Sequence, residues 1–178
     1  VNAASATINS IKLERSANGL FYNVSDVTGF AVGSGCQSTG QRSVMCAAAG
    51  ISEIRINAGD GDDRVELNTS TFAVVLGSSG NDTIVSRHIN SQARLNGNDG
   101  NDTILGTDFD KLFGQNDHDT LSGGRLLNGG SGNDKLFGLG GNDSLVGGPG
   151  TDHLDGGAGF DDLCLEGETT VACEAFSL

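Results

Sequence analysis

Aspartates recur every nine residues near the C-terminal end of the chain, each in a glycine-rich setting. Residues 129–164 read in nines as GGSGNDKLF, GLGGNDSLV, GGPGTDHLD and GGAGFDDLC, with aspartate sixth and leucine eighth. Carboxylates that lie beside backbone carbonyls form a set of hard oxygen ligands, which is what Ca²⁺ binds in proteins. The pattern therefore predicts cation binding. Its aspartates are Asp134, Asp143, Asp152 and Asp161, and its leucines are Leu136, Leu145, Leu154 and Leu163.

The spacing also predicts the elements that must position these carboxylates. A segment of the form x-Leu-x can form a very short strand with one side chain directed inward. The six residues before it then turn the chain through half a circle, and glycine suits such a turn because it reaches positive φ without a Cβ clash. Two nonapeptides complete one coil, and successive coils stack with their leucines in an inner column. Turns on the same edge would lie about 4.8 Å apart, which brings their aspartates together.

Composition agrees with a thin aliphatic core. The chain has 178 residues, with 29 glycines, one proline, no tryptophan and a formal net charge of −13. This charge makes nucleic acid or an anionic membrane surface a poor partner, and no apolar run is long enough to span a membrane. Most of the acid coincides with the glycines, because residues 57–165 carry sixteen Asp and one Glu against six Arg or Lys, a net charge of −11.

The nonapeptide resembles the RTX, or haemolysin-type, calcium-binding repeat, GGxGxDxUx. Gly129, Gly130, Gly132, Asp134 and Leu136 match it position by position, and the runs that begin at residues 147 and 156 match equally well. The resemblance implies an all-β fold, a right-handed parallel β-roll (a β-solenoid) of about six coils. It also implies that the sixth-position aspartates and the turn carbonyls bind several Ca²⁺ ions.

Related turns extend the pattern towards the N-terminus. The segments NAGDGDDRV (57–65), GSSGNDTI (77–84), GNDGNDTI (97–104) and GQNDHDTL (114–121) place aspartates at 63, 82, 102 and 119, and the series continues to 134 and 152 in steps of 19, 20, 17, 15 and 18. That step is the period of a full coil. The predicted calcium ligands are Gly59, Asp60, Gly61, Asp63, Gly77, Gly80, Asp82, Gly97, Asp99, Gly100, Asp102, Asp110, Gly114, Asn116, Asp119, Gly129, Gly132, Asp134, Asp143, Gly147, Gly150, Asp152, Gly156, Gly159 and Asp161.

The turns between these segments predict that the two edges of the roll differ. Residues 67–73, 86–93 and 122–126 lack the aspartate, and 106–110 is one residue short, which leaves Asp110 the weakest candidate. One edge should therefore carry a continuous calcium ladder. The other should bind calcium only towards the C-terminus, around Asp143 and Asp161, with no metal between residues 67 and 93.

Four cysteines flank the repeats. Sequence alone allows three pairings, and zinc ligation is a rival interpretation. We favour the local pairs Cys36–Cys46 and Cys164–Cys173, because the repeats hold the two ends apart, and disulfides imply an oxidising, extracellular setting. We expect residues 1–56 to form an N-terminal β cap, 57–163 the roll and 164–178 a C-terminal disulfide cap. Within the N-terminal cap, short β segments are expected at 6–8, 20–24 and 30–32, with a hairpin turn at Asn18-Gly19.

No signature of catalysis is present. The chain has no HExxH motif, no GxSxG turn and no P-loop, and carboxylates committed to calcium are poor acids or bases, so we expect no enzymatic activity. His88, His118 and His153 are isolated and are expected to be solvated. The third positions of successive turns do not form a row of threonine side chains along the roll. This weakens the interpretation of the chain as an ice-binding protein.

The sequence thus predicts a secreted, bacterial calcium-binding protein that folds on Ca²⁺. It would serve as a structural or adhesive extracellular module, self-associating into homo-oligomers or end to end through its open strand edges. The alternative is a non-catalytic accessory module of a larger secreted enzyme of the protease, lipase or epimerase type, in which such repeats occur.

Overall fold

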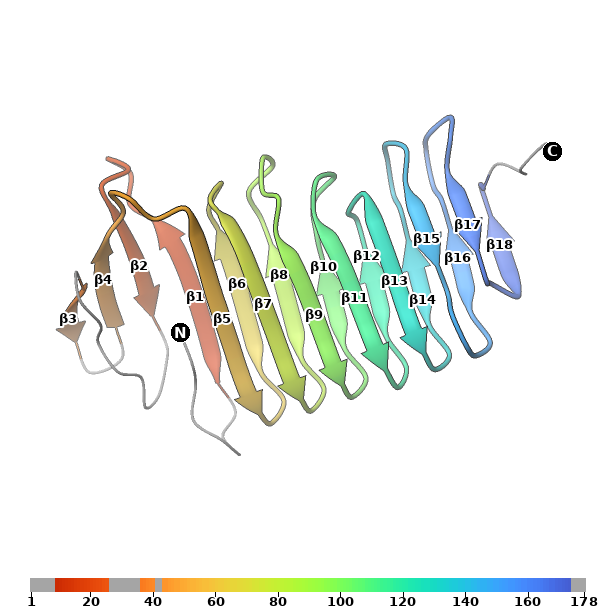
Figure 1. The fold of residues 1–178 in the computed structure, drawn as a ribbon, viewed down its shortest axis with the longest axis horizontal. Coiled ribbons are helices and arrows are strands. Elements are labelled where there is room, and N and C mark those ends of the chain that lie inside the picture. Colours follow the sequence, from red (N-terminus) through yellow and green to blue (C-terminus); the bar gives the residue numbers. More distant parts are fainter. Residues whose placement is uncertain (1–8, 26–35, 41–42, 174–178) are drawn as a thin grey trace.

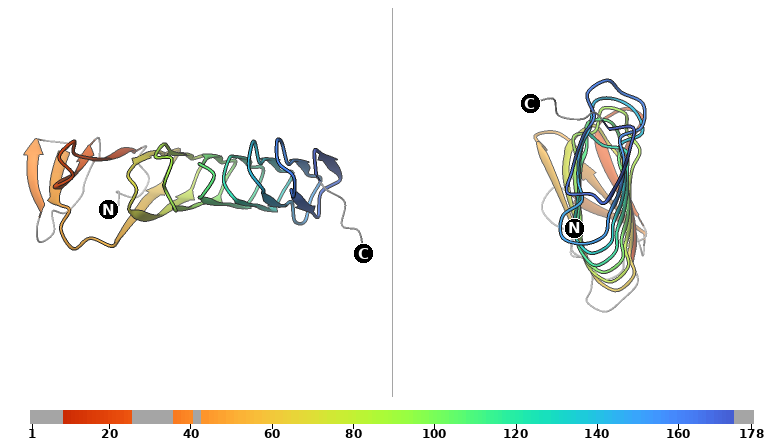
Figure 2. Two further views of the ribbon diagram at one scale, coloured as in Figure 1. Left: turned by 90° about the horizontal axis from the view of Figure 1, so that it is seen from above. Right: turned by 90° about the vertical axis from the view of Figure 1, so that its right-hand side faces the viewer.

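The computed structural model describes residues 9–25, 36–40 and 43–173, and in this part of the chain every regular element is a β-strand. The strands form two sheets that face each other along the length of a β-solenoid of about six turns (Figure 1). Seen along its axis, each coil is a flattened loop with two long sides (Figure 2). The expected all-β roll is confirmed, and the described residues contain no helix that could cross a membrane.

The seven-stranded sheet, which we call sheet A, is parallel throughout. Its order is β17-β15-β13-β11-β9-β7-β5. These strands are β5 (Glu53–Asp60), β7 (Phe72–Ser79), β9 (Arg94–Asp99), β11 (Lys111–Asn116), β13 (Leu126–Ser131), β15 (Ser144–Val146) and β17 (Leu163–Leu165).

The other sheet, sheet B, has eleven strands in the order β18-β16-β14-β12-β10-β8-β6-β1-β2-β4-β3. Its roll strands are β6 (Arg64–Asn68), β8 (Thr83–Ser86), β10 (Thr103–Leu105), β12 (Thr120–Ser122), β14 (Lys135–Phe137), β16 (His153–Asp155) and β18 (Thr169–Val171). Its N-terminal strands are β1 (Ser10–Arg15), β2 (Phe21–Ser25), β3 (Cys36–Gly40) and β4 (Ser43–Ala47).

The core is two facing columns of aliphatic side chains, one from each sheet. The three-residue strands β10, β12, β14, β15 and β16 direct their central residue inward, and β6 directs Val65 and Leu67 inward on either side of Glu66. Register pairs Val75 with Leu95 in sheet A and Val65 with Ile84 in sheet B, and these side chains are at most 1% exposed. The predicted inner positions of Leu136, Leu145 and Leu154 are confirmed. The columns consist of Ile56, Val75, Leu95, Leu112, Leu127 and Leu145 on one side and Val65, Ile84, Ile104, Leu121, Leu136 and Leu154 on the other.

The predicted register of the last repeat was wrong by one residue. Cys164, not Leu163, pairs with Leu145, and Leu163 pairs with Ser144. The turn before β17 holds one residue more than the turns before it, since six positions separate Gly156 from the buried Asp162, where five separate Gly147 from Asp152. This shift places Cys164 in line with the leucine column, where it bonds Cys173.

The N-terminal strands extend sheet B rather than forming a separate layer. Strand β1 pairs parallel with β6 and antiparallel with β2, and the turn between β1 and β2 has Gly19 at φ 70°, as expected for the hairpin at Asn18-Gly19. Both expected disulfides, Cys36–Cys46 and Cys164–Cys173, are present. The β segments expected at 6–8 and 30–32 lie outside the described residues.

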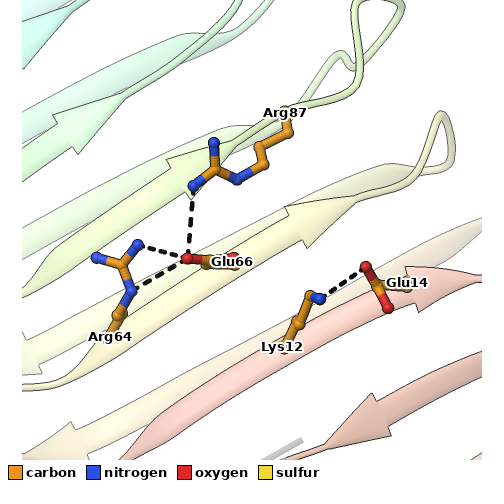
Figure 3. A network of polar contacts seen from close by, with 5 residues as sticks. All are labelled: Lys12, Glu14, Arg64, Glu66 and Arg87. Carbon is orange, nitrogen blue, oxygen red and sulfur yellow. Dashed lines mark hydrogen bonds and ion pairs between the residues drawn. The ribbon is translucent and has the colours of Figure 1, made fainter.

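The outer face of sheet B near this junction carries paired charges. Glu66 accepts from Arg64 and lies 3.5 Å from Arg87 on the next coil, and Lys12 lies 2.9 Å from Glu14 on β1 (Figure 3). The two arginines hold the pKa of Glu66 below its ordinary value, chiefly through the hydrogen bond from Arg64.

Candidate metal centre

The two edges of the roll are formed by different sets of turns. Turns that lead from sheet A to sheet B form one edge, which we call the first edge, and turns that lead back from sheet B to sheet A form the second edge. The first-edge turns are short and alike, whereas several second-edge loops protrude (Figure 1).

Glycine is required where the first-edge turns stack. Gly80 and Gly100 both have φ of 121°. A Cβ at Gly80 would lie 2.4 Å from the carbonyl oxygen of Gly61, and one at Gly100 would lie 2.2 Å from that of Gly80. Each glycine therefore supplies both a left-handed backbone and the close approach of one coil to the next.

The predicted first-edge aspartates form a continuous ladder through the stacked turns. Each is at most 3% exposed, and its Oδ1 accepts a hydrogen bond from the backbone N–H of the aspartate one coil earlier. The donor–acceptor pairs are Asp63–Asp82 and Asp82–Asp102 at 2.7 Å, and Asp102–Asp119, Asp119–Asp134 and Asp134–Asp152 at 2.8 Å.

Other residues close this ladder at both ends. The N–H of Asn9, just before β1, donates to Asp63 Oδ1 at 2.5 Å. The N–H of Asp152 donates to Glu168 Oε2 at 2.5 Å, so that a glutamate takes the place of the aspartate in the last coil. Sequence reasoning missed both ends, because neither residue lies in a glycine-rich repeat.

A second ladder runs beside the first in the opposite direction. The residue before each buried aspartate accepts a hydrogen bond from the N–H of its counterpart one coil later, as in Asn81 to Asp62 Oδ1 at 2.7 Å and Asn101 to Asn81 Oδ1 at 2.8 Å. His118 continues the series, since its Nδ1 accepts from Asn133 N–H at 2.8 Å. The recurring Asn-Asp pair was the available signal, and sequence reasoning did not use it.

The second oxygen of each ladder carboxylate is what makes the first edge a candidate metal centre. The Oδ2 atoms of Asp63, Asp82, Asp102, Asp119, Asp134 and Asp152 are buried and have no hydrogen-bond partner among the described residues. A buried, unsatisfied carboxylate oxygen is costly unless a cation or a donor reaches it.

Backbone carbonyls share the same spaces. The missing Cβ of Gly114 marks a point 2.1 Å from Asp119 Oδ2 and 2.5 Å from the carbonyl oxygen of Gly129. The corresponding point at Gly77 lies 2.1 Å from Asp82 Oδ2 and 2.7 Å from the Gly97 oxygen. A carboxylate oxygen and a carbonyl oxygen thus face one space that glycine leaves open, and the carboxylate oxygen has no hydrogen-bond partner among the described residues.

Burial raises the pKa of these carboxyls. Removal from water, with smaller contributions from neighbouring carboxylates, outweighs the backbone hydrogen bond to each carboxylate and raises the pKa of Asp82 to about 7, of Asp102 to about 6 and of Asp119 to about 8. For Asp63, Asp134 and Asp152 the pKa is also raised, again chiefly by burial. A bound cation would reverse this effect and keep the carboxylates ionised.

On the second edge, the same arrangement occurs only near the C-terminus. Asp143 N–H donates to Asp162 Oδ1 at 2.9 Å, and Asp143 Oδ2 is buried without a protein partner. Burial raises the pKa of Asp143 to about 7, with Asp162 and then Asp108 adding to the rise. The predicted ligand Asp161 is exposed, and Asp162 takes its place because of the extra residue in this turn.

Asp110 differs from the other buried aspartates. Its Oδ1 accepts from Ala93 N–H at 2.7 Å, as in the ladder, but its Oδ2 accepts from the N–H and the hydroxyl of Thr107 at 2.9 and 3.0 Å. Both oxygens are therefore used by the turn itself. Nothing comparable to the Asp143–Asp162 pair occurs between residues 67 and 93, all of which the structure describes.

The remaining predicted ligands lie around these carboxylates. Asp60, Asp99 and Asn116 form an outer row where sheet A strands enter the turns, with Asn116 Nδ2 donating to Asp99 Oδ1 at 2.7 Å. The predicted glycines lie in the same turns and contribute backbone carbonyls. Among the described residues, no three His, Cys, Asp or Glu side chains converge on one point, so a metal would need these carbonyls as ligands.

The residues present therefore fit Ca²⁺. They offer carboxylate and carbonyl oxygens only, in spaces where the carboxylate Oδ2 atoms lack donors among the described residues, and Ca²⁺ takes such ligands in numbers of six to eight. When bound, the ion would supply the positive charge that the stacked carboxylates lack.

Comparison with known protein families agrees with this chemistry. Residues 96–125 and 128–163 match the model of the RTX calcium-binding nonapeptide repeat, in four copies. No curated protein and no solved structure matches the chain significantly. The ladder extends the same turn geometry beyond the matched residues, to Asp82 and Asp63.

Proposed function

Since residues 96–163 of this chain are RTX calcium-binding nonapeptide repeats, we propose that the whole roll from Asp63 to Glu168 is one calcium-stabilised unit. The observation that carries this proposal is the row of buried Oδ2 atoms, which includes Asp63 and Asp82 outside the matched residues. The ligands would be the carboxylates of Asp63, Asp82, Asp102, Asp119, Asp134, Asp152, Asp143 and Asp162, together with glycine carbonyls of the same turns.

Calcium would act on the fold rather than on a substrate. Without it, like charges crowd along the ladder and the core is only two columns of aliphatic side chains. Ligand binding to the folded state alone stabilises that state by mass action. An extracellular concentration of about a millimolar would saturate even weak sites, so the roll would become stable after export.

Circular dichroism tests this role directly. Calcium-free protein should lose most of its β-sheet signal at neutral pH and regain it on addition of Ca²⁺, while Mg²⁺, which demands a tighter octahedral shell, should restore much less. A spectrum that does not change on removal of calcium would contradict the proposal.

We propose a structural or adhesive role outside the cell for the loaded roll, because most of its exposed large hydrophobic side chains lie along the second edge. Ile89, Phe109, Leu139 and Phe160 occupy the loops of that edge and are between 50% and 88% exposed. The first-edge turns present Asp62, Asn81, Asn101 and Asn133 instead. An apolar row of this kind is typical of a contact surface.

Sedimentation velocity of calcium-loaded protein would test this role. Concentration-dependent association that is lost in Phe160→Ser, and not in Phe137→Ser on the outer face of β14, supports it. Protein that stays monomeric at all concentrations would argue for a different role.

A further inference from the structure

A cationic pocket opens on the second edge, although the chain as a whole is strongly acidic. It has a volume of about 350 Å³ and is lined by Phe72, Gln92, Ala93, Arg94, Phe109, Lys111 and Arg125. These residues come from the starts of neighbouring sheet A strands and the loops just before them. Arg94 and Lys111 are direct register partners on β9 and β11.

The three cations of the pocket make no ion pair with any described carboxylate. Elsewhere on the roll, Arg64 and Arg87 share Glu66, and Lys12 pairs with Glu14 (Figure 3). The nearest buried acid, Asp110, directs both oxygens to Ala93 and Thr107. The loop that supplies Phe109 also carries Asp108 and Asp110, so this region holds three cations against two carboxylates and keeps a net positive charge.

Aromatic rings give the pocket apolar walls. Phe72 and Phe109 are 41% and 50% exposed, which is high for phenylalanine. The guanidinium of Arg94 lies 4.4 Å from the ring centroid of Phe113, a cation–π contact that holds it in place. The pocket therefore combines fixed positive charge with flat apolar surface.

The acidic turns do not cancel this field. The main row of carboxylates lies on the first edge, at the other end of strands that are six residues long in β9 and β11. Six extended residues span about 20 Å, or roughly two screening lengths at physiological salt. A small anion at the second edge would therefore be influenced mainly by Arg94, Lys111 and Arg125 and, with opposite sign, by Asp108 and Asp110 of the same loop.

We propose that this pocket binds a small organic anion, a single carboxylate or sulfate attached to a flat ring. The volume is at the lower end of the range for small-molecule sites, which fits a ligand of one ring. The anionic group would lie between Lys111 and one of the two arginines, Arg94 or Arg125. The ring face would pack against Phe72 and Phe109. An anionic group beside an apolar ring face occurs both in aromatic acids and in sugar acids, and the experiment distinguishes these two sources.

Amide chemical shifts of ¹⁵N-labelled, calcium-loaded protein would be followed while benzoate, galacturonate, benzamide or sulfate is added at constant free calcium. We expect saturable shifts at residues 92–94, 109–111 and 125 with benzoate or galacturonate. Saturation by benzoate alone identifies aromatic acids as the source, and saturation by galacturonate alone identifies sugar acids. Benzamide and sulfate should each bind roughly ten-fold more weakly, since each lacks one half of the interaction.

Lys111→Gln and Lys135→Gln form a matched pair, because both lysines are exposed first residues of strands but lie on opposite edges of the roll. Lys111→Gln should weaken binding of the effective acid about ten-fold, and Lys135→Gln should leave it unchanged. Equal effects of the two variants, shifts only outside the pocket, or benzamide binding as tightly as the effective acid would each overturn the proposal.

Discussion

The backbone N–H of Asp102 donates to Oδ1 of Asp119 on the next coil at 2.8 Å, while Oδ2 of the same Asp119 carboxylate is buried and has no partner in the protein. One oxygen therefore serves the fold and the other is available to a cation. Substitutions that change only the second oxygen can separate folding from calcium binding.

Asp119→Asn is the first such substitution. Asparagine keeps the Oδ1 acceptor for Asp102, removes a buried negative charge and directs an NH₂ group towards the space shared with the Gly129 carbonyl. We expect the variant to be more stable than wild type without calcium and less stable with it, by about 2 kcal/mol in each case. Thermal unfolding with calcium, and the residual β-sheet circular dichroism signal without it, measure the change of sign.

Asp117→Asn is its control. This carboxylate lies in the same turn but is exposed, and asparagine accepts its φ of 73° readily. It should change stability by less than about 0.5 kcal/mol in either condition. If Asp119→Asn destabilised the protein equally with and without calcium, the carboxylate would have only a structural role.

Gly114→Ala tests the open space beside Asp119. Its Cβ would lie 2.1 Å from Asp119 Oδ2 and 2.5 Å from the Gly129 oxygen, so one of the two coils must shift. We expect a loss of about 2–4 kcal/mol in calcium and weaker calcium binding by isothermal titration.

Gly140→Ala makes the same change in a second-edge loop where the nearest heavy atom, the Ala158 oxygen, would be 3.7 Å from the new Cβ. It should be neutral or slightly stabilising. Similar losses in the two variants would show that the cost comes from the backbone and not from the crowded oxygens.

The calcium-free protein should become less stable as pH rises. Burial raises the pKa of Asp82 to about 7 and of Asp119 to about 8, so the folded chain binds more protons than the unfolded chain between about pH 4 and these values. The free energy of unfolding therefore falls as pH increases through this window. The β-sheet circular dichroism signal of calcium-free protein at about pH 5.5 and about pH 8 tests the direction, and a larger signal at the alkaline pH would contradict it.

Much of this architecture could be predicted from the sequence, because glycine turns and single inward leucines recur in register. Leu136, Leu145 and Leu154 lie in the core as their spacing indicates. The same spacing failed at the last repeat, where FDD offers two adjacent aspartates and one extra turn residue makes Asp162, not Asp161, the buried one. Periodicity alone cannot choose between neighbouring acids when a loop changes length.

Contacts between distant segments could not be predicted in this way. The parallel pairing of β1 with β6 and the bonds from Asn9 to Asp63 and from Asp152 to Glu168 close the two ends of the stack. In each of these contacts, at least one of the two partners lies outside the repeats. The cationic pocket likewise depends on loops from several coils, whose juxtaposition only the register defines.

The second edge gives the last prediction, since two of the three buried aspartates described there differ in how their second oxygen is used. Asp143 Oδ2 has no protein partner, whereas Asp110 Oδ2 accepts from the N–H and hydroxyl of Thr107. Asp143→Asn should therefore remove calcium from the second edge, while Asp110→Asn should lower stability by about 1–2 kcal/mol, through its broken turn, without changing the number of bound ions. Native mass spectrometry counts the ions, and anomalous scattering from calcium-soaked crystals locates them. A calcium ion found between residues 67 and 93, or lost with Asp110→Asn and kept with Asp143→Asn, would show that carboxylates other than those with a free buried oxygen bind the metal.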